Sequence, residues 1–168
     1  MPFSVNGKLT GGKFYVDGGI SSQFITGLLF ALPLLEEDSE IILTSHLESK
    51  PYVDITLGTL REHGCQVEEA ENGYFVKGGQ HYMPFSGRVE GDYSQAAFFK
   101  VANSLGSDID IAGLSEKSFQ GDKKIVEICE KIVYNKNGGL RPFDLDCSDI
   151  PDLVPVLTVL GSFCEGKS

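Results

Sequence analysis

The chain has 168 residues, of which 41% are hydrophobic, so it can bury a core as one domain or two small units. It carries 24 acidic and 14 basic residues, and this net charge of -10 argues against nucleic acid and anionic membrane surfaces as partners. No segment has the roughly 18 consecutive apolar residues of a membrane span, and no signal peptide is recognisable at the N-terminus, so a cytoplasmic protein is expected.

The first predicted element is a strand over residues 13–16, followed by two glycines and two serines. Apolar residues at helical spacing then predict a helix from Ser22 to about Phe30 that weakens at Pro33. The hydroxyls of Ser21 and Ser22 would lie beside the unpaired N–H groups of the first helical turn, a geometry that suits a phosphate. Serine before an apolar helix is also the ordinary N-cap, and these residues alone favour the plain cap.

The next elements continue the alternation of strand and helix. Residues 39–44 are β-branched and apolar, which predicts a buried strand, and an apolar stripe then predicts a helix that stops at Gly64. Two further short strands flank Asn72-Gly73, a strong hairpin signal. The first half of the chain therefore reads β-α-β-α-β-β.

The same order then begins again. Ser94-Gln95 echoes Ser22-Gln23, and a strand is predicted over residues 108–112. A repeat of about 70 residues predicts small α/β units that pack their helices against one another.

The second copy continues with a helix and a hairpin turn at Asn137-Gly138, and a third copy begins at residues 143–146. A helix over residues 153–163 follows, and the pattern then stops at the end of the chain. We therefore expect this sequence to be a fragment of a longer protein, with an artificial start at Met1.

Four cysteines are spread widely along the chain, at Cys65, Cys129, Cys147 and Cys164. They form no C-x-x-C pair, and no histidine lies at metal-ligand spacing from them. Reduced, buried thiols are therefore expected.

Five motifs make the pattern specific. In chain order they are Gly-x-Ser-Ser-Gln-Phe-x-x-x-Leu-Leu (residues 19–29), Ser-Lys-Pro-Tyr-x-Asp-x-Thr (49–56), Glu-Gly-Asp-x-Ser (90–94), Gln-Gly-Asp (120–122) and Asp-Ile-Pro-Asp (149–152). Together they resemble the middle of the 5-enolpyruvylshikimate-3-phosphate synthases, the enolpyruvyl transferases of aromatic amino-acid biosynthesis. The resemblance covers essentially the whole chain, and it turns the balance for the paired serines toward phosphate binding.

The resemblance implies a role for each residue that matches a motif. In that family Ser21, Ser22 and Ser49 would hold the phosphate of shikimate 3-phosphate. Gln23 would lie between the two substrates, and Tyr52 would pack on the shikimate ring. From the residues alone, the tyrosine is equally well explained by core packing.

The later motifs supply an acid and several structural groups. Asp152 would bind the shikimate hydroxyls and accept a proton from the attacking one; without the family it is equally an acidic first-turn residue favoured by the helix dipole. Asp92, Ser94, Gln120 and Asp122 also match family motifs, and we expect them to form caps and turn bonds.

The resemblance also implies a fold and a reaction. The expected fold is α/β, an inside-out barrel in which each of two domains contains three β-α-β-α-β-β units, incomplete in this chain. Residues 1–86 would belong to the first domain and 87–168 to the second, with substrates between them. The reaction needs no metal or organic cofactor, and phosphoenolpyruvate gives its enolpyruvyl group to the 5-hydroxyl of shikimate 3-phosphate by addition and elimination.

The family's lysine and arginine ligands for phosphoenolpyruvate lie outside the matched region. We therefore expect the isolated chain to lack transferase activity, to bind shikimate 3-phosphate weakly or not at all, and to self-associate through exposed surfaces. Two alternatives remain open: a fragment of a UDP-N-acetylglucosamine enolpyruvyl transferase, and a noncatalytic α/β binding module.

Overall fold

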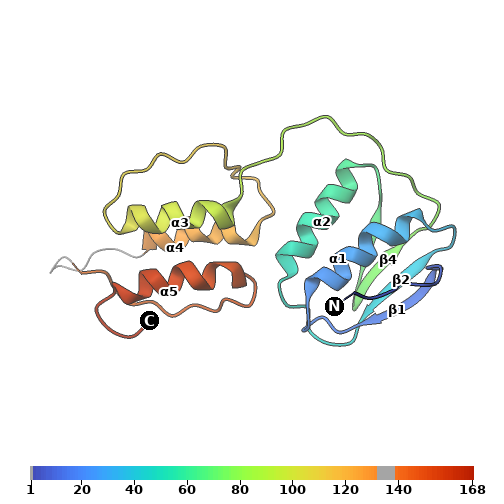
Figure 1. Ribbon diagram of the computed structural model, residues 1–168, viewed down its shortest axis with the longest axis horizontal. Helices are drawn as coiled ribbons and strands as arrows, with labels where there is room; N and C mark the ends of the chain where they lie inside the picture. Colours follow the sequence, from blue (N-terminus) through green and yellow to red (C-terminus); the bar gives the residue numbers. More distant parts are fainter. Residues whose placement is uncertain (1, 132–138) are drawn as a thin grey trace. The chain divides into compact units, whose positions relative to one another are not determined.

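The computed structural model describes residues 2–131 and 139–168 (Figure 1). They form two compact units, residues 1–86 and 87–168, each with its own hydrophobic core. In this described part of the chain, no helix is both long and apolar enough to cross a membrane.

The first unit contains a four-stranded sheet with the strand order β1-β2-β4-β3. Strands β1 (Gly12–Val16) and β2 (Ser39–Leu43) run parallel, and Val16 pairs with Leu43 at their carboxyl ends. Strand β4 (Gly73–Val76) pairs antiparallel with both β2 and β3 (Val67–Ala70). Because β1 and β2 are parallel, the chain must cross over between them, and it does so through a helix.

Helices α1 (Ser22–Ala31) and α2 (Lys50–Glu62) pack against each other and against the sheet (Figure 1). Both were predicted from apolar spacing, and both predictions are confirmed. A short 3-10 turn, Leu32–Leu34, follows α1 at the predicted proline. The core between helices and sheet contains Ile25, Leu29, Leu32, Ile41, Val53, Leu57, Leu60, Tyr74 and Val76.

The predicted hairpin is present, but its glycine acts differently from what the sequence suggested. Glu71 and Asn72 form the connection, and Gly73 is the first residue of β4. Gly73 has φ of +146°, and a Cβ there would lie 1.9 Å from the carbonyl oxygen of Ile41. The close approach of β2, together with the positive φ, therefore requires glycine at this position.

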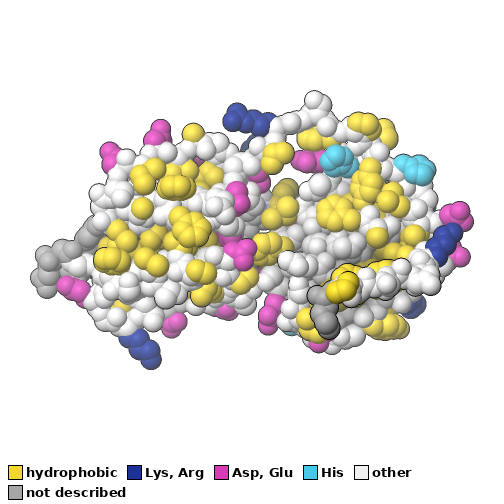
Figure 2. Space-filling view, viewed as in Figure 1, with side chains coloured by type: hydrophobic (Ala, Val, Ile, Leu, Met, Phe, Trp, Pro, Cys, Tyr) yellow, Lys and Arg dark blue, Asp and Glu magenta, His cyan; other side chains and the backbone are white. Residues whose placement is uncertain are grey.

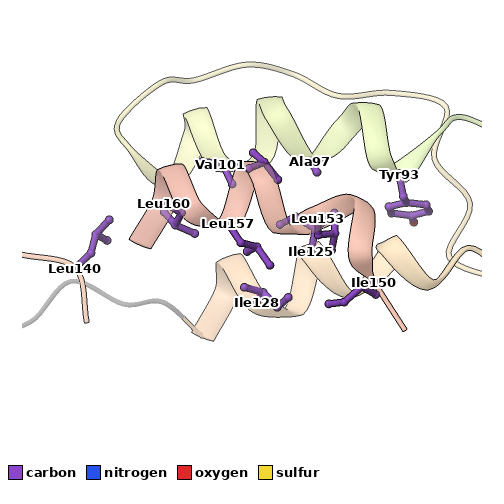
Figure 3. Packing of buried hydrophobic residues seen from close by; sticks show 11 residues of the cluster. Tyr93, Ala97, Val101, Ile125, Ile128, Leu140, Ile150, Leu153, Leu157 and Leu160 are labelled. Carbon is purple, nitrogen blue, oxygen red and sulfur yellow. The ribbon is translucent and has the colours of Figure 1, made fainter. Parts of the chain in front are cut away.

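The second unit is built from helices in its described residues. These are α3 (Tyr93–Ser104), α4 (Lys124–Lys131) and α5 (Val154–Ser162), with 3-10 turns Gly121–Lys123 and Pro151–Leu153 before the last two. The helix predicted over residues 153–163 is thus confirmed to within one residue. Figure 3 shows the core that the three helices share: Tyr93, Ala97, Val101, Ile125, Ile128, Leu140, Ile150, Leu153, Leu157 and Leu160.

The strand predicted over residues 108–112 is wrong. The backbone of Ile109 within it has a side-chain partner: the amide side chain of Asn103 donates to the carbonyl oxygen of Ile109 and accepts from its N–H, both at 2.8 Å. Residues 143–146 are also irregular, and an isolated bridge between Leu140 and Cys164 is the β pairing present in this unit's described residues. Without a neighbouring strand among the described residues of this unit, a strand-favouring sequence has no ladder to join there. The predicted turn at Asn137-Gly138 lies outside the described residues.

The four cysteines carry free thiols. Cys65 is buried, as predicted, but Cys129, Cys147 and Cys164 are only half-buried. These three pack at the edge of the second core and not inside it.

Candidate functional site

Two neighbouring loops leave the carboxyl ends of β1 and β2 and lead into the two helices of the first unit. Because these strands are parallel and in register, loops 17–21 and 44–49 emerge at the same edge of the sheet. Figure 1 shows α1 and α2 beginning at this edge. The structure therefore brings the predicted phosphate ligands Ser21, Ser22 and Ser49 onto adjacent loops or helix starts.

Ser21 is the N-cap of α1. Its backbone is extended, and its hydroxyl oxygen accepts a hydrogen bond from the N–H of Gln23 at 3.2 Å. The capping interpretation is thus confirmed, but capping uses only a lone pair, so the hydroxyl proton can still be donated to an anion. The first turn of α1 contains no acidic residue, which leaves the positive end of the helix dipole uncompensated there.

Ser49, immediately before α2, has a left-handed backbone with φ of 57° and ψ of 35°. Among the described residues it is the one non-glycine residue with positive φ. A serine in this region costs conformational energy, and such residues cluster at binding and active sites. Its carbonyl oxygen accepts from the N–H of Tyr52 at 3.1 Å, which starts the helix.

The two loops are in direct backbone contact. The N–H of Glu48 donates to the carbonyl oxygen of Gly18 at 3.2 Å. A Cβ on Gly18 would lie 2.8 Å from the carbonyl oxygen of His46, so this approach requires glycine. The spacing between the two helix starts is consequently fixed by the loops themselves.

A carboxylate also lies in this contact. Asp17 accepts from the hydroxyl of Ser45 and, at 2.9 Å, from the N–H of Gly19. These two hydrogen bonds, that of Ser45 first, lower the pKa of Asp17. Sequence reasoning missed both side chains: an Asp-Gly pair is a recognisable turn signal, but nothing in the sequence marks Ser45.

The other predicted residues of the first unit flank these loops. Gln23 is exposed in the first turn of α1, and Tyr52 is half-buried in the first turn of α2. Lys50 forms an ion pair with Asp54 one helical turn further on and lies 4.0 Å from Glu69. Since its charge is compensated within the unit, Lys50 is not a candidate phosphate ligand.

Asp152 belongs to the second unit. It lies in the turn Pro151–Leu153 that leads into α5, and its side chain is exposed. The nearby carboxyl of Asp122 is only 3% exposed, and burial, followed by the charges of Asp152 and Asp92, raises the pKa of Asp122. Asp152 therefore presents an exposed carboxyl group near a buried one.

The remaining motif residues of the second unit make structural bonds, as predicted. Asp92 caps α3 by accepting from the N–H of Ser94 at 2.8 Å. The hydroxyl of Ser94 donates to Asp122 at 2.5 Å, and the second carboxyl oxygen, Oδ1, has no hydrogen-bond partner in the described structure. The side chain of Gln120 accepts from the N–H of Tyr93 at 2.7 Å and donates to the carbonyl oxygen of Gly91.

Solved structures with a similar fold are enolpyruvyl transferases. An EPSP synthase from Acinetobacter baumannii matches 95% of this chain and 40% of its own chain, with a TM-score of 0.69 and 18% identity. The enolpyruvyl transferase NikO from Streptomyces tendae matches 95% of this chain and 43% of its own, with a TM-score of 0.63 and 14% identity. At these identities the likeness concerns the fold, and it confirms the predicted α/β class.

Sequence comparison is more specific. The chain is 43% identical over 180 aligned positions to a 3-phosphoshikimate 1-carboxyvinyltransferase from Clostridium perfringens, and 45% identical over 175 positions to one from Methanocaldococcus jannaschii. It spans about 42% of the length of these curated relatives. The family model described as EPSP synthase (3-phosphoshikimate 1-carboxyvinyltransferase) matches residues 1–168. The chain therefore belongs to the EPSP synthase family.

Proposed function

We propose that this chain carries the shikimate 3-phosphate half of an EPSP synthase active site. The observation that carries the proposal is the edge of the sheet from which two adjacent loops, bearing Ser21, Ser22 and Ser49, lead into two helices. Hydroxyl donors and unpaired helix N–H groups are suited to a phosphate group. The names of the relatives supply the substrate class, a 3-phosphoshikimate.

In this proposal the first unit binds and orients the acceptor substrate. The three serines hold the phosphate, Tyr52 packs on the shikimate ring, and Gln23 lies toward the second substrate, phosphoenolpyruvate. Residues 1–86 would belong to one domain of the enzyme. Because the acceptor is held in one orientation, part of the entropy that the reaction would cost is already lost when the substrate binds.

The second unit, residues 87–168, would belong to the other domain and supply the base. Asp152 accepts the proton of the shikimate 5-hydroxyl while the oxygen of that hydroxyl forms a bond to the central carbon of phosphoenolpyruvate. The methylene carbon of phosphoenolpyruvate takes up a proton in the same addition. In the elimination the resulting methyl group loses a proton and inorganic phosphate leaves, which restores the carbon–carbon double bond. A carboxylate is a suitable general base for this step because it is the deprotonated form of the acid and can accept the proton directly.

The charge balance limits what the isolated chain can do. With 24 acidic and 14 basic residues its net charge of -10 opposes the binding of two anionic substrates, so we expect no binding of phosphoenolpyruvate and no turnover. Phosphate release by the purified chain with both substrates would contradict this expectation. The substrates are small anions, and a cytoplasmic location fits their metabolic class.

A titration of the purified chain with shikimate 3-phosphate, followed by amide chemical shifts, tests the binding role. We expect weak binding, with Kd on the order of millimolar, and shifts concentrated at Ser21, Ser22 and Ser49. Shikimate without phosphate and UDP-N-acetylglucosamine serve as control ligands, and neither should shift these amides. The amide of Ser94 is an internal control for a helix start outside the site.

Three results would reject the binding role. Shifts confined to residues away from the two loops would mean that the phosphate binds elsewhere. The absence of any shift at high ligand concentration would mean that this chain alone does not hold the phosphate, and a response to the UDP sugar alone would favour the related transferase.

The isolated chain is also expected to self-associate. Figure 2 shows hydrophobic side chains gathered over α3 and α5, and the exposed ones include Phe98, Phe99, Val159 and Phe163. Apolar surface of this kind favours contact with another protein surface. Sedimentation velocity should show a concentration-dependent increase in mass, and a monomer at all concentrations would contradict the expectation.

A further inference from the structure

One group of hydrogen bonds crosses between the two serine-bearing loops. The N–H of Gly19 lies 2.9 Å from Oδ1 of Asp17 and 3.1 Å from Oγ of Ser45. The hydroxyl of Ser45 donates to the same carboxylate oxygen. We call Asp17, Gly19 and Ser45 the interloop clasp, because the first two belong to loop 17–21 and the third to loop 44–49.

The carboxylate of the interloop clasp should oppose the binding of an anion nearby. Its hydrogen bonds lower the pKa of Asp17, so this side chain is charged at neutral pH. A carboxylate beside a phosphate raises the energy of the complex by Coulomb repulsion. Because the whole chain has a net charge of -10, a carboxylate at this position needs another explanation.

Geometry supplies that explanation. Two residues separate Gly19 from Ser22, the first residue of α1, and four residues separate Ser45 from Lys50, the first residue of α2. The contact between Gly18 and Glu48 joins the same loops through their backbones. Holding these loops together therefore restricts how far apart the two helix starts can lie.

We propose that Asp17 and Ser45 are positioning residues of the phosphate site: they do not touch the phosphate, and they hold the hydroxyls of Ser21 and Ser49 at the separation it requires. This inference rests on the proposed function of the two serines. It gives the acidic residue a role that its charge alone would oppose.

Electrostatic repulsion and positioning predict opposite changes in the affinity for shikimate 3-phosphate when Asp17 is substituted. Asp17→Ala removes both the charge and the clasp. If charge dominated, the variant would bind shikimate 3-phosphate more tightly. Positioning predicts binding weakened about threefold to tenfold, the range expected for loss of one or two hydrogen bonds that orient ligand groups.

Conservative variants separate the two effects further. Asp17→Asn keeps an acceptor oxygen for Gly19 and Ser45 but removes the charge, so it should bind at least as tightly as the native chain. Ser45→Ala keeps the charge of Asp17 and removes the hydroxyl that joins the loops, so it should weaken binding at least as much as Asp17→Ala. Ser45→Thr retains the hydroxyl and should restore native binding. Thr59→Ala, which removes a hydroxyl bonded to Ile55 later in α2, is a matched control without effect on binding.

The experiment is the amide-shift titration of the native chain and these variants with shikimate 3-phosphate, with circular dichroism to verify folding. Weaker binding by the two alanine variants, with native or tighter binding by Asp17→Asn and Ser45→Thr, supports positioning. Tighter or unchanged binding by Asp17→Ala overturns it while the proposed function stands. Failure of the native chain to bind overturns both. If the alanine variants do not fold, Asp17→Asn decides: binding well below native overturns the inference.

Discussion

The starts of α1 and α3 carry the same Ser-Gln pair in the sequence, yet the structure equips them differently. At α1 the cap is the neutral Ser21, and the first turn contains no acidic side chain. At α3 the cap is Asp92, whose carboxylate accepts from the N–H groups of Ser94 at 2.8 Å and Gln95 at 3.4 Å. The second helix start therefore holds an anion of its own where a phosphate would otherwise bind.

The serine hydroxyls at the two helix starts also differ in whether they are available to a ligand. Ser94 donates to the buried carboxyl of Asp122, so its proton is committed within the unit. Ser22 is half-buried at the edge where two loops meet. The comparison teaches that a repeated motif preserves a helix start, while the charge of the cap decides whether that start remains available to a ligand.

The largest expected effect is a loss of stability in one unit that leaves the other unit unchanged. Leu153 is fully buried in the second core, so Leu153→Ala leaves a cavity and should destabilise that unit by about 2–5 kcal/mol. Hydrogen exchange should show lost protection in α3 and unchanged protection in α1. Equal loss in both helices would mean that the two cores unfold as one.

The second prediction gives α1 the built-in anion of α3. Ser21→Asp retains a good N-cap, so the stability of the first unit should change by less than about 1 kcal/mol. The carboxylate competes with the phosphate, and binding of shikimate 3-phosphate should fall more than tenfold, about 1.4 kcal/mol. Ser21→Asn, a neutral cap, is the control and should lose less. Native affinity in the aspartate variant would remove the basis of the comparison.

The third prediction concerns the cap of α3. Asp92→Ala removes the acceptor for two N–H groups and should cost about 0.5–2 kcal/mol of stability in the second unit. Asp92→Ser should recover most of this loss, since serine also caps. Urea denaturation measures both, and the alanine variant should leave phosphate binding by the first unit unchanged. Weakened binding in that variant would count against separate roles for the two helix starts.

The smallest effect is a change in pH dependence. Burial is the main cause of the raised pKa of Asp122. A carboxyl group with a higher pKa when folded favours folding most below its unfolded pKa of about 4, and this contribution is lost as pH rises through the folded pKa. Asp122→Asn does not titrate, so its stability relative to the native chain should increase between pH 4 and pH 7. Parallel stability curves in urea would show that this carboxyl does not titrate differently in the folded state.

Local periodicity was sufficient to predict most of the first unit. The apolar spacing around Ile25 and Leu29 predicted α1, and the β-branched run of residues 39–44 predicted β2. Both predictions succeeded because these patterns reflect directly which side chains the fold buries. Gly73 predicted the hairpin correctly, although it is required by a close approach and not by the turn.

The second unit and the details of the site depend on partners that sequence does not reveal. The strand expected at residues 108–112 is absent, and Asn103 instead bonds to the backbone of Ile109, an interaction without a sequence signal. The left-handed conformation of Ser49 likewise has no local cause, since serine has no preference for positive φ. The serines of the candidate site could be predicted from the family motifs, but not the clasp that joins their loops.

The central claim is that hydroxyls from two adjacent loops of the first unit bind one phosphate. A crystal structure of the chain with shikimate 3-phosphate tests it most directly. The account predicts electron density for the phosphate within hydrogen-bonding distance of the hydroxyls of both Ser21 and Ser49. Density for the phosphate at the start of α3, or at a place that neither serine reaches, would contradict it.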